Sequence, residues 1–147
     1  MSALANGKAL GGDTGNMLPF IQSAFADQGS DVTTTSTTWV DLLSVTLTTG
    51  ANFLIIMASF SATTALAANN VMFRLLVDGV AKRGASTMDT VSFASSGAIH
   101  GRYVVSAGEH TIKLQWQASS ALSAARVRPA ANPESEHASL LVMEVRV

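Results

Sequence analysis

The sequence predicts an all-β protein, a two-sheet antiparallel sandwich of jelly-roll-like type with an extended N-terminal arm. Runs rich in Val, Ile, Thr and aromatic residues recur at intervals of about ten residues from residue 32 onward, which gives about eight short strands. Turn signals built from Gly, Asn, Asp and Pro separate these runs. No segment sustains the 3.6-residue apolar period of an amphipathic helix. We therefore expect strands throughout the folded part of the chain.

The N-terminal segment differs in composition from the rest of the chain. Residues 1–31 are rich in Gly, Ala, Ser and Asn, and their glycines oppose a continuous helix. Pro19 interrupts any strand there, whereas residues 20–27 are long enough for one or two helical turns. The expected division is an extended arm at 1–31 and a β-sandwich at 32–147.

Four apolar residues of the arm are candidates for contact with a partner. They are its natural anchors, because the residues around them are small or polar: Leu18, Phe20, Ile21 and Phe25. They either fold back on their own domain or dock onto another chain, and composition does not decide between the two.

The strands expected before residue 61 contain one unusual segment. The run TTTSTTWVDLLSVTL forms one long or two short strands and ends at Thr48-Thr49-Gly50. The next run, NFLIIMASF at 52–60, has no charge, and both of its alternating sets are apolar. A strand on a half-exposed sheet alternates apolar with polar residues, so a second cover is needed here.

The two faces of this strand lead to a prediction of an interface. Phe53, Ile55 and Met57 face one side of the strand, and Leu54, Ile56 and Phe60 face the other. One set lies in the core, and the other lies against the arm or a neighbouring subunit. We predict a subunit interface at these residues: Leu54, Ile56, Phe60 and Trp39.

The remaining strands follow from alternation and turns. VMFRLLVD directs Phe73, Leu75 and Val77 to one face, and Asp78-Gly79 predicts a tight hairpin to VAKRG because both positions tolerate positive φ. STMDTVSFASSG is a short strand or a loop, and AIHGRYVV is a strand.

The C-terminal part of the chain supplies the last strands. EHTIKLQWQ buries Ile112, Leu114 and Trp116, and one weak strand follows between residues 118 and 137. SLLVMEVRV alternates, with the apolar residues Leu141, Met143 and Val145 on one face. Its other face carries two charged residues, Glu144 and Arg146.

Composition limits the classes of partner. Of the 147 residues 48% are apolar and only 13% are charged, against about 25% charged in a typical soluble domain. Surface is therefore buried against a partner or solvated by Ser and Thr. The net charge of −1 gives no electrostatic basis for binding nucleic acid. The start of the chain lacks the pattern of a secretion signal, and no apolar run reaches the length of a membrane span.

No residue pattern indicates catalysis, a metal or a cofactor. Asp13-Thr14-Gly15 matches the tripeptide of aspartic proteases, but it lies in the arm with no strand before it. His100, His110 and His137 lack metal-ligand spacing, and the chain has no cysteine. No G-x-S-x-G elbow or phosphate-binding glycine loop is present. We expect a protein that is not an enzyme.

Two blocks of sequence carry a family resemblance, FRLLVDG at 73–79 and SAGEHTIKLQW at 106–116. With the segments around Trp39 and after residue 138, they resemble a β domain of tailed-phage virion proteins, which include capsid decoration (cement) proteins, head fibres and tail-fibre tips. The resemblance covers residues 33–147. It implies a jelly-roll-like sandwich without enzymatic activity that assembles, often as a trimer and sometimes as a dimer.

The short arm favours one member of this group. Fibre proteins usually carry a long repetitive shaft before such a domain, and residues 1–31 are too few for one. We therefore expect a decoration protein on the outer capsid surface of a virion, with the major capsid protein and its own copies as partners. The alternative is a receptor- or glycan-binding tip, in which an exposed aromatic residue such as Trp39 stacks on sugars.

Overall fold

The computed structural model describes residues 20–64, 69–87, 95–121, 124–127 and 137–146. The described residues form ten strands and no helix, so none of them forms a helix that could span a membrane. The strands are β1 (Phe20–Asp27), β2 (Val32–Thr34), β3 (Val40–Thr49), β4 (Phe53–Thr64), β5 (Val71–Val77), β6 (Val80–Thr87), β7 (Ser95–Val104), β8 (Gly108–Ala118), β9 (Ala125–Val127) and β10 (Ala138–Val145).

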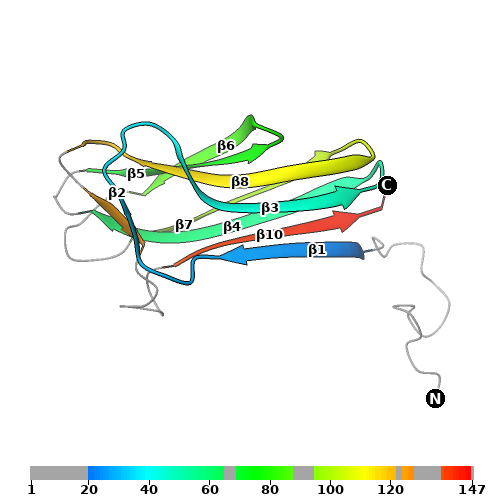
Figure 1. Ribbon diagram of the computed structural model, residues 1–147, viewed down its shortest axis with the longest axis horizontal. Helices are drawn as coiled ribbons and strands as arrows, with labels where there is room; N and C mark the ends of the chain where they lie inside the picture. The colour runs from blue at the N-terminus through cyan, green and yellow to red at the C-terminus, as the bar shows by residue number, and fades with distance from the viewer. Residues whose placement is uncertain (1–19, 65–68, 88–94, 122–123, 128–136, 147) are drawn as a thin grey trace, which may run out of the picture.

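The strands form two antiparallel sheets that face each other (Figure 1). Sheet I has the order β1-β10-β4-β7, and the short strands β9 and β2 continue it at the far end of β4. Sheet II has the order β3-β8-β5-β6. The chain crosses repeatedly from one sheet to the other, and this order is that of a jelly roll. The predicted fold class is confirmed.

The turn predictions are also confirmed. The hairpin between β5 and β6 has positive φ at both central residues, 51° at Asp78 and 76° at Gly79, as a two-residue turn of this kind requires. The segment before residue 50 divides into β2 and β3, and the weak strand is β9. Of the ambiguous run at 86–97, residues 86–87 end β6, residues 95–97 begin β7, and 88–94 lie outside the described residues.

The N-terminal division differs from the prediction. Residues 20–27 are neither helix nor arm but strand β1, which pairs with β10 along its length, from Phe20 opposite Val145 to Asp27 opposite Ser139. The sandwich therefore includes residues 20–27, which the prediction assigned to the arm. One or two helical turns would leave many backbone N–H and C=O groups of residues 20–27 without hydrogen bonds. Pairing with the free edge of β10 supplies these hydrogen bonds, so the segment forms a strand. Residues 1–19, including Leu18, lie outside the described residues.

The core lies between the sheets and is centred on β4. Leu54 and Ile56 are fully buried and Phe60 is 2% exposed. Phe60 stacks on Phe73 of sheet II with ring centroids 3.9 Å apart, and Phe73 in turn neighbours Trp116 at 6.5 Å. The predicted inward residues of β5 and β8 are thereby confirmed.

The prediction of a subunit interface at Leu54, Ile56 and Phe60 is wrong, because these side chains fill the core of their own chain. Both faces of β4 are apolar, and its sequence alone gave no basis for choosing the inward face. The opposite face, with Phe53, Ile55 and Met57, is the one that turns away from sheet II.

Candidate interaction surface

The outer side of sheet I carries apolar residues on four neighbouring strands. Met57 of β4 lies between Leu141 of β10 and His100 of β7, and Leu141 in turn lies opposite Phe25 of β1. The next row contains Ile55 and Met143, and the row after it contains Phe53 and Val104. We call this set the outer apolar face, made of Phe25, Phe53, Ile55, Met57, Val104, Leu141 and Met143.

Several residues of the outer apolar face are strongly exposed. The exposed fraction is 60% for Phe25, 50% for Met57 and 74% for Val104. Single exposed apolar side chains are common on proteins, but contiguous apolar patches mark sites of interaction. Arg102 borders the face and places its guanidinium 3.7 Å from the centroid of the Phe53 ring, a cation–π contact. The face is thus apolar at its centre and has the guanidinium of Arg102 at its β7 border.

The outer side of sheet II has the opposite character. Asp41 accepts hydrogen bonds from Lys113 Nζ and Gln115 Nε2, both at 2.6 Å, and Arg74 Nε donates to Gln115 Oε1 at 2.8 Å. The hydrogen bond from Lys113 and then that from Gln115 lower the pKa of Asp41. The outer side of sheet II is therefore mainly polar, with Met72 and Leu76 of β5 as apolar members beside Gln117 and Lys113. Of the six large apolar side chains that are exposed in the described part of the chain, five lie on sheet I and one, Val80, lies on sheet II.

The predicted contact residues fall in two places. Phe20 (58% exposed), Ile21 (40%) and Phe25 lie on β1, the outermost strand of sheet I, where they border or belong to the outer apolar face. Their contact with a partner remains a prediction. Trp39 lies beside sheet II instead, half-buried, with the guanidinium of Arg74 4.5 Å from its ring centroid. The structure does not bring Trp39 to the other candidates.

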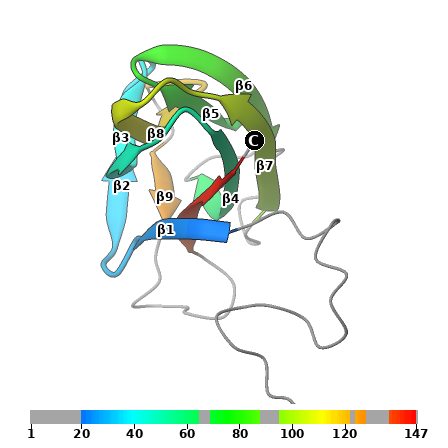
Figure 2. The ribbon, with the colours of Figure 1, turned by 90° about the vertical axis from the view of Figure 1, so that its right-hand side faces the viewer.

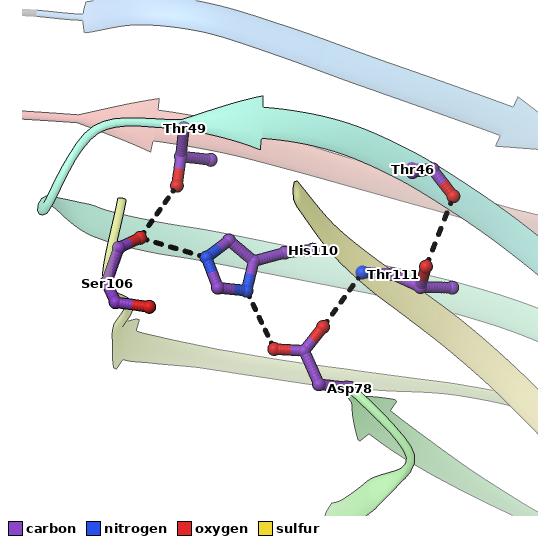
Figure 3. A network of polar contacts seen from close by, with 6 residues as sticks. All are labelled: Thr46, Thr49, Asp78, Ser106, His110 and Thr111. Atoms are coloured by element: carbon purple, nitrogen blue, oxygen red, sulfur yellow. Dashed lines mark hydrogen bonds and ion pairs between the residues drawn. The ribbon is translucent and has the colours of Figure 1, made fainter. Parts of the chain in front are cut away.

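A polar network fixes the β5–β6 hairpin to β8 (Figure 3). Asp78 Oδ2 lies 2.7 Å from Nδ1 of His110, and Asp78 Oδ1 accepts the backbone N–H of Thr111 at 2.9 Å. The other ring nitrogen of His110, Nε2, lies 2.9 Å from the carbonyl oxygen of Ser106. Both ring nitrogens face acceptors, and only an imidazolium donates to both. This arrangement favours the cationic form of His110, and its pKa is raised accordingly.

This network is a structural cross-link rather than a catalytic arrangement. A Ser–His–Asp site needs a hydroxyl beside the imidazole, whereas Ser106 presents its backbone carbonyl to His110. His100 lies on the outer side of sheet I opposite Met57, away from His110. Among the described residues, no three acidic, histidine or cysteine side chains gather as metal ligands would.

The His110–Asp78 pair predicts how stability depends on pH. The hydrogen bond to Asp78, and then that to Ser106, raise the pKa of His110, while burial lowers it less. A raised folded pKa stabilises the protein fully below the ordinary value of about 6.5, and this stabilisation is lost as pH rises through the folded value. For Asp78, burial raises the pKa, but hydrogen bonds from His110 and Thr111 outweigh it, so its contribution is lost only in acid.

The variant Asp78→Asn tests this pair while keeping the turn, because Asn also tolerates the positive φ of this position. We expect it to lose about 1–2 kcal/mol of unfolding free energy at pH 6. The deficit should shrink above the folded pKa of His110, because the wild-type protein has then lost the ion pair as well. Urea unfolding at pH 6 and pH 9 measures both values. An equal deficit at both pH values would show that the imidazolium contributes nothing.

One polar feature that could not be predicted from the sequence is a buried carboxylate, that of Glu144. Glu144 is 1% exposed and lies on the core side of β10, together with Leu140 and Val142. The alternation in the last strand is as predicted, but the face with the glutamate is the inward one. No local signal distinguishes this glutamate from a solvated one, because its partners come from β1 and from the β3–β4 turn.

Comparisons with known proteins give only distant similarities. No model of a protein family matches the chain, and no curated protein matches its sequence. Among solved structures it is similar to a C-terminal domain of EclA, described as a sugar-binding protein, at 11% identity and a TM-score of 0.47, covering 97% of this chain and 99% of that one.

It is also similar to the VP2 protein of infectious bursal disease virus. VP2 in a subviral particle is 11% identical with a TM-score of 0.47 and covers 86% of this chain. A D431N mutant VP2 in T=1 particles is 10% identical with a TM-score of 0.49 and covers 93% of this chain. The match spans only 38% and 40% of those VP2 chains. Similarity this low says nothing about what the present chain binds.

Proposed function

We propose that this chain is a non-enzymatic structural protein of a virion, and more narrowly a capsid decoration (cement) protein that binds the outside of a phage shell. The observation that carries the proposal is the outer apolar face, since sheet I presents it on the side that no other described strand covers. The resemblance of residues 33–147 to phage virion domains supports the choice of a shell as partner. The low content of charged residues, 13%, also fits a surface that works by contact area.

The size of the face indicates how it works. Four strands about 4.8 Å apart and three same-side rows about 6.8 Å apart span about 400 Å². A stable pairwise interface needs about 800 Å² from each partner, so this face alone is too small for a tight dimer of two free copies. The outer apolar face is large enough to be one of several contacts made at the same time, because linked contacts give a much higher overall affinity than each contact alone.

Self-association would supply these multiple contacts. We propose that copies of the chain assemble, as a trimer in preference to a dimer, so that several outer apolar faces engage neighbouring capsid subunits at once. Phe20 and Ile21 extend the contact along β1, the edge strand that also carries Phe25 of the face. Bridging of this kind opposes the outward pressure of packaged DNA.

The test is binding to undecorated shells of the encoding phage. Met57→Lys places a charge at the centre of the face, and we expect occupancy to fall at least tenfold, because the charge has no partner in an apolar contact. Val80→Lys is the matched control: Val80 is 56% exposed, similar to Met57, but lies on the β5–β6 hairpin. We expect the control to bind like the wild-type protein.

Solution mass distinguishes the two possible occupants of the face. If Met57→Lys keeps the oligomeric state of the wild-type protein and loses shell binding, the face docks on the shell as proposed. If it converts an oligomer into monomers, the face is an interface between copies, and the proposed docking is wrong. Full shell binding by Met57→Lys would contradict the proposal as well.

A further inference from the structure

A cleft of about 450 Å³ opens where the two sheets meet on their β6–β7 side. Strands β6 and β7 are the outermost strands of their sheets and lie side by side without sharing a ladder (Figure 2). The volume lies within the range of about 300–1,000 Å³ typical of small-molecule sites. Its polar lining comes from the β5–β6 hairpin, β7 and β8, and consists of Asp78, Lys82, Arg102, Tyr103, Ser106 and His110.

The charges of this lining are unbalanced. Both carboxylate oxygens of Asp78 are already used by His110 and by the backbone N–H of Thr111. Lys82 and Arg102 have no carboxylate within ion-pair distance in the described part of the chain. Lys82 lies close enough to Asp78 to help lower the pKa of its carboxyl, and the Arg102 guanidinium lies over the Phe53 ring with its N–H groups free of any carboxylate among the described residues. The lining thus carries more positive than negative charge, which favours an anionic ligand.

The rest of the lining is apolar and aromatic. Val80 and Val104 are 56% and 74% exposed at the cleft. The ring of Tyr103 packs directly over Gly101, where a larger residue would collide with it. The buried Tyr103 hydroxyl has no hydrogen-bond partner among the described residues, and a buried polar group of this kind calls for a partner such as a bound water or a ligand. A ligand that fits must combine an anionic group with a body that packs on aromatic and aliphatic side chains.

We propose that the cleft binds a sugar acid, whose carboxylate is held by Lys82 and Arg102 and whose ring lies against Tyr103 and Val104. A carboxylate suits a guanidinium and an ammonium presented together, and the faces of a sugar ring carry the C–H groups that pack on an aromatic ring. The site shares Val104 and the bordering Arg102 with the β7 edge of the outer apolar face but does not include Met57 at its centre, and the proposal does not depend on the proposed function.

Ligand-observed NMR with the full chain tests the proposal, with D-glucuronate as the probe. We expect a dissociation constant of about 1 mM, typical of a shallow site with two charge-assisted contacts. D-Glucose, which lacks the carboxylate, should bind at least tenfold more weakly. Acetate, which lacks the ring, and inorganic phosphate should bind more weakly as well.

Two neighbouring residues of β6 supply a matched pair of variants. Lys82 and Arg83 are both exposed cations, but only Lys82 lines the cleft. Lys82→Gln should weaken glucuronate binding about tenfold, and Arg83→Gln should leave it unchanged. Both variants should melt at the wild-type temperature, because neither side chain is buried or ion-paired among the described residues.

Several outcomes would overturn the assignment. Equal loss of binding in both variants would show attraction to general surface charge rather than a site. Phosphate or acetate binding as tightly as glucuronate would show an oxyanion site with no role for the ring. If no binding is seen at a glucuronate concentration ten times the expected dissociation constant, the site does not exist. Lys82→Gln should still bind to shells. A loss of glucuronate binding in this variant is therefore separate from any failure of the proposed docking on the shell.

Discussion

Replacing Phe60 with alanine is expected to lower the unfolding free energy by about 4 kcal/mol. The ring is 2% exposed, stacks on Phe73 at 3.9 Å and lies over Gly97, where an added Cβ would sit 2.6 Å from it. Its removal loses the transfer free energy of a large side chain and leaves a cavity between rigid sheets. For a chain of this size the midpoint of thermal unfolding should fall by about 12 °C.

Met57→Ala is the control for this prediction, because it truncates a large apolar residue of the same strand on the opposite face. Met57 is 50% exposed, so its truncation should change stability by no more than about 0.5 kcal/mol. Chemical unfolding of the two variants measures both values. Similar losses in both would contradict the assignment of Phe60 to the core and Met57 to the outer apolar face.

Glu144→Gln is expected to lower the unfolding free energy by about 3 kcal/mol, although it changes the side chain by a single group. Glu144 Oε1 accepts hydrogen bonds from the Gly50 backbone N–H at 2.8 Å and from Asn52 Nδ2 at 2.6 Å. Its Oε2 accepts from Gln22 Nε2 at 2.6 Å. All three partners are donors, so the amide NH₂ of a glutamine necessarily meets at least one donor. The variant therefore loses hydrogen bonds and leaves buried groups unpaired.

The same carboxylate predicts a loss of stability in acid. Burial raises the pKa of Glu144, but the hydrogen bonds from Asn52, Gln22 and Gly50 together outweigh it, so the pKa is lower than that of a free glutamate. A depressed folded pKa gives a contribution that is present above the ordinary value of about 4.3 and is lost as pH falls through the folded value. Glu144→Gln should thus differ most from the wild-type protein at neutral pH and least in strong acid.

Glu109→Gln is the control for Glu144→Gln. Glu109 is exposed at the start of β8, so its replacement should leave stability within about 0.5 kcal/mol at every pH. Guanidinium unfolding from pH 3 to pH 7 compares the two variants. If Glu144→Gln is as stable as the wild-type protein at pH 7, the buried carboxylate does not tie β10 to β1 and to the β3–β4 turn.

Much of the fold follows from local patterns in the sequence. The alternation at Phe73, Leu75 and Val77 and at Ile112, Leu114 and Trp116 depends on a period of two that any pleated strand imposes. Asp78-Gly79 requires positive φ, which few other residue pairs accept. These features are predictable because each is set within a few residues of chain.

The sites were less predictable, because pairing between distant strands places them. β1 becomes a strand only because β10, more than a hundred residues later, offers it an edge. The cleft needs β6 and β7 side by side, and the partners of Glu144 come from β1 and from the β3–β4 turn. Local composition carries no record of such neighbours, since strand register is fixed by the sheet as a whole.

The sequence by itself determined that one strand, NFLIIMASF, would have two apolar faces and that only one of them could be satisfied by its own core. Which face turns inward was decided by the tertiary structure alone. Register with β10 and β7 places Leu54, Ile56 and Phe60 against sheet II and leaves Phe53, Ile55 and Met57 outside. A shift of one residue in register would exchange the two sets, and a strand that is apolar on both sides contains nothing that forbids the shift.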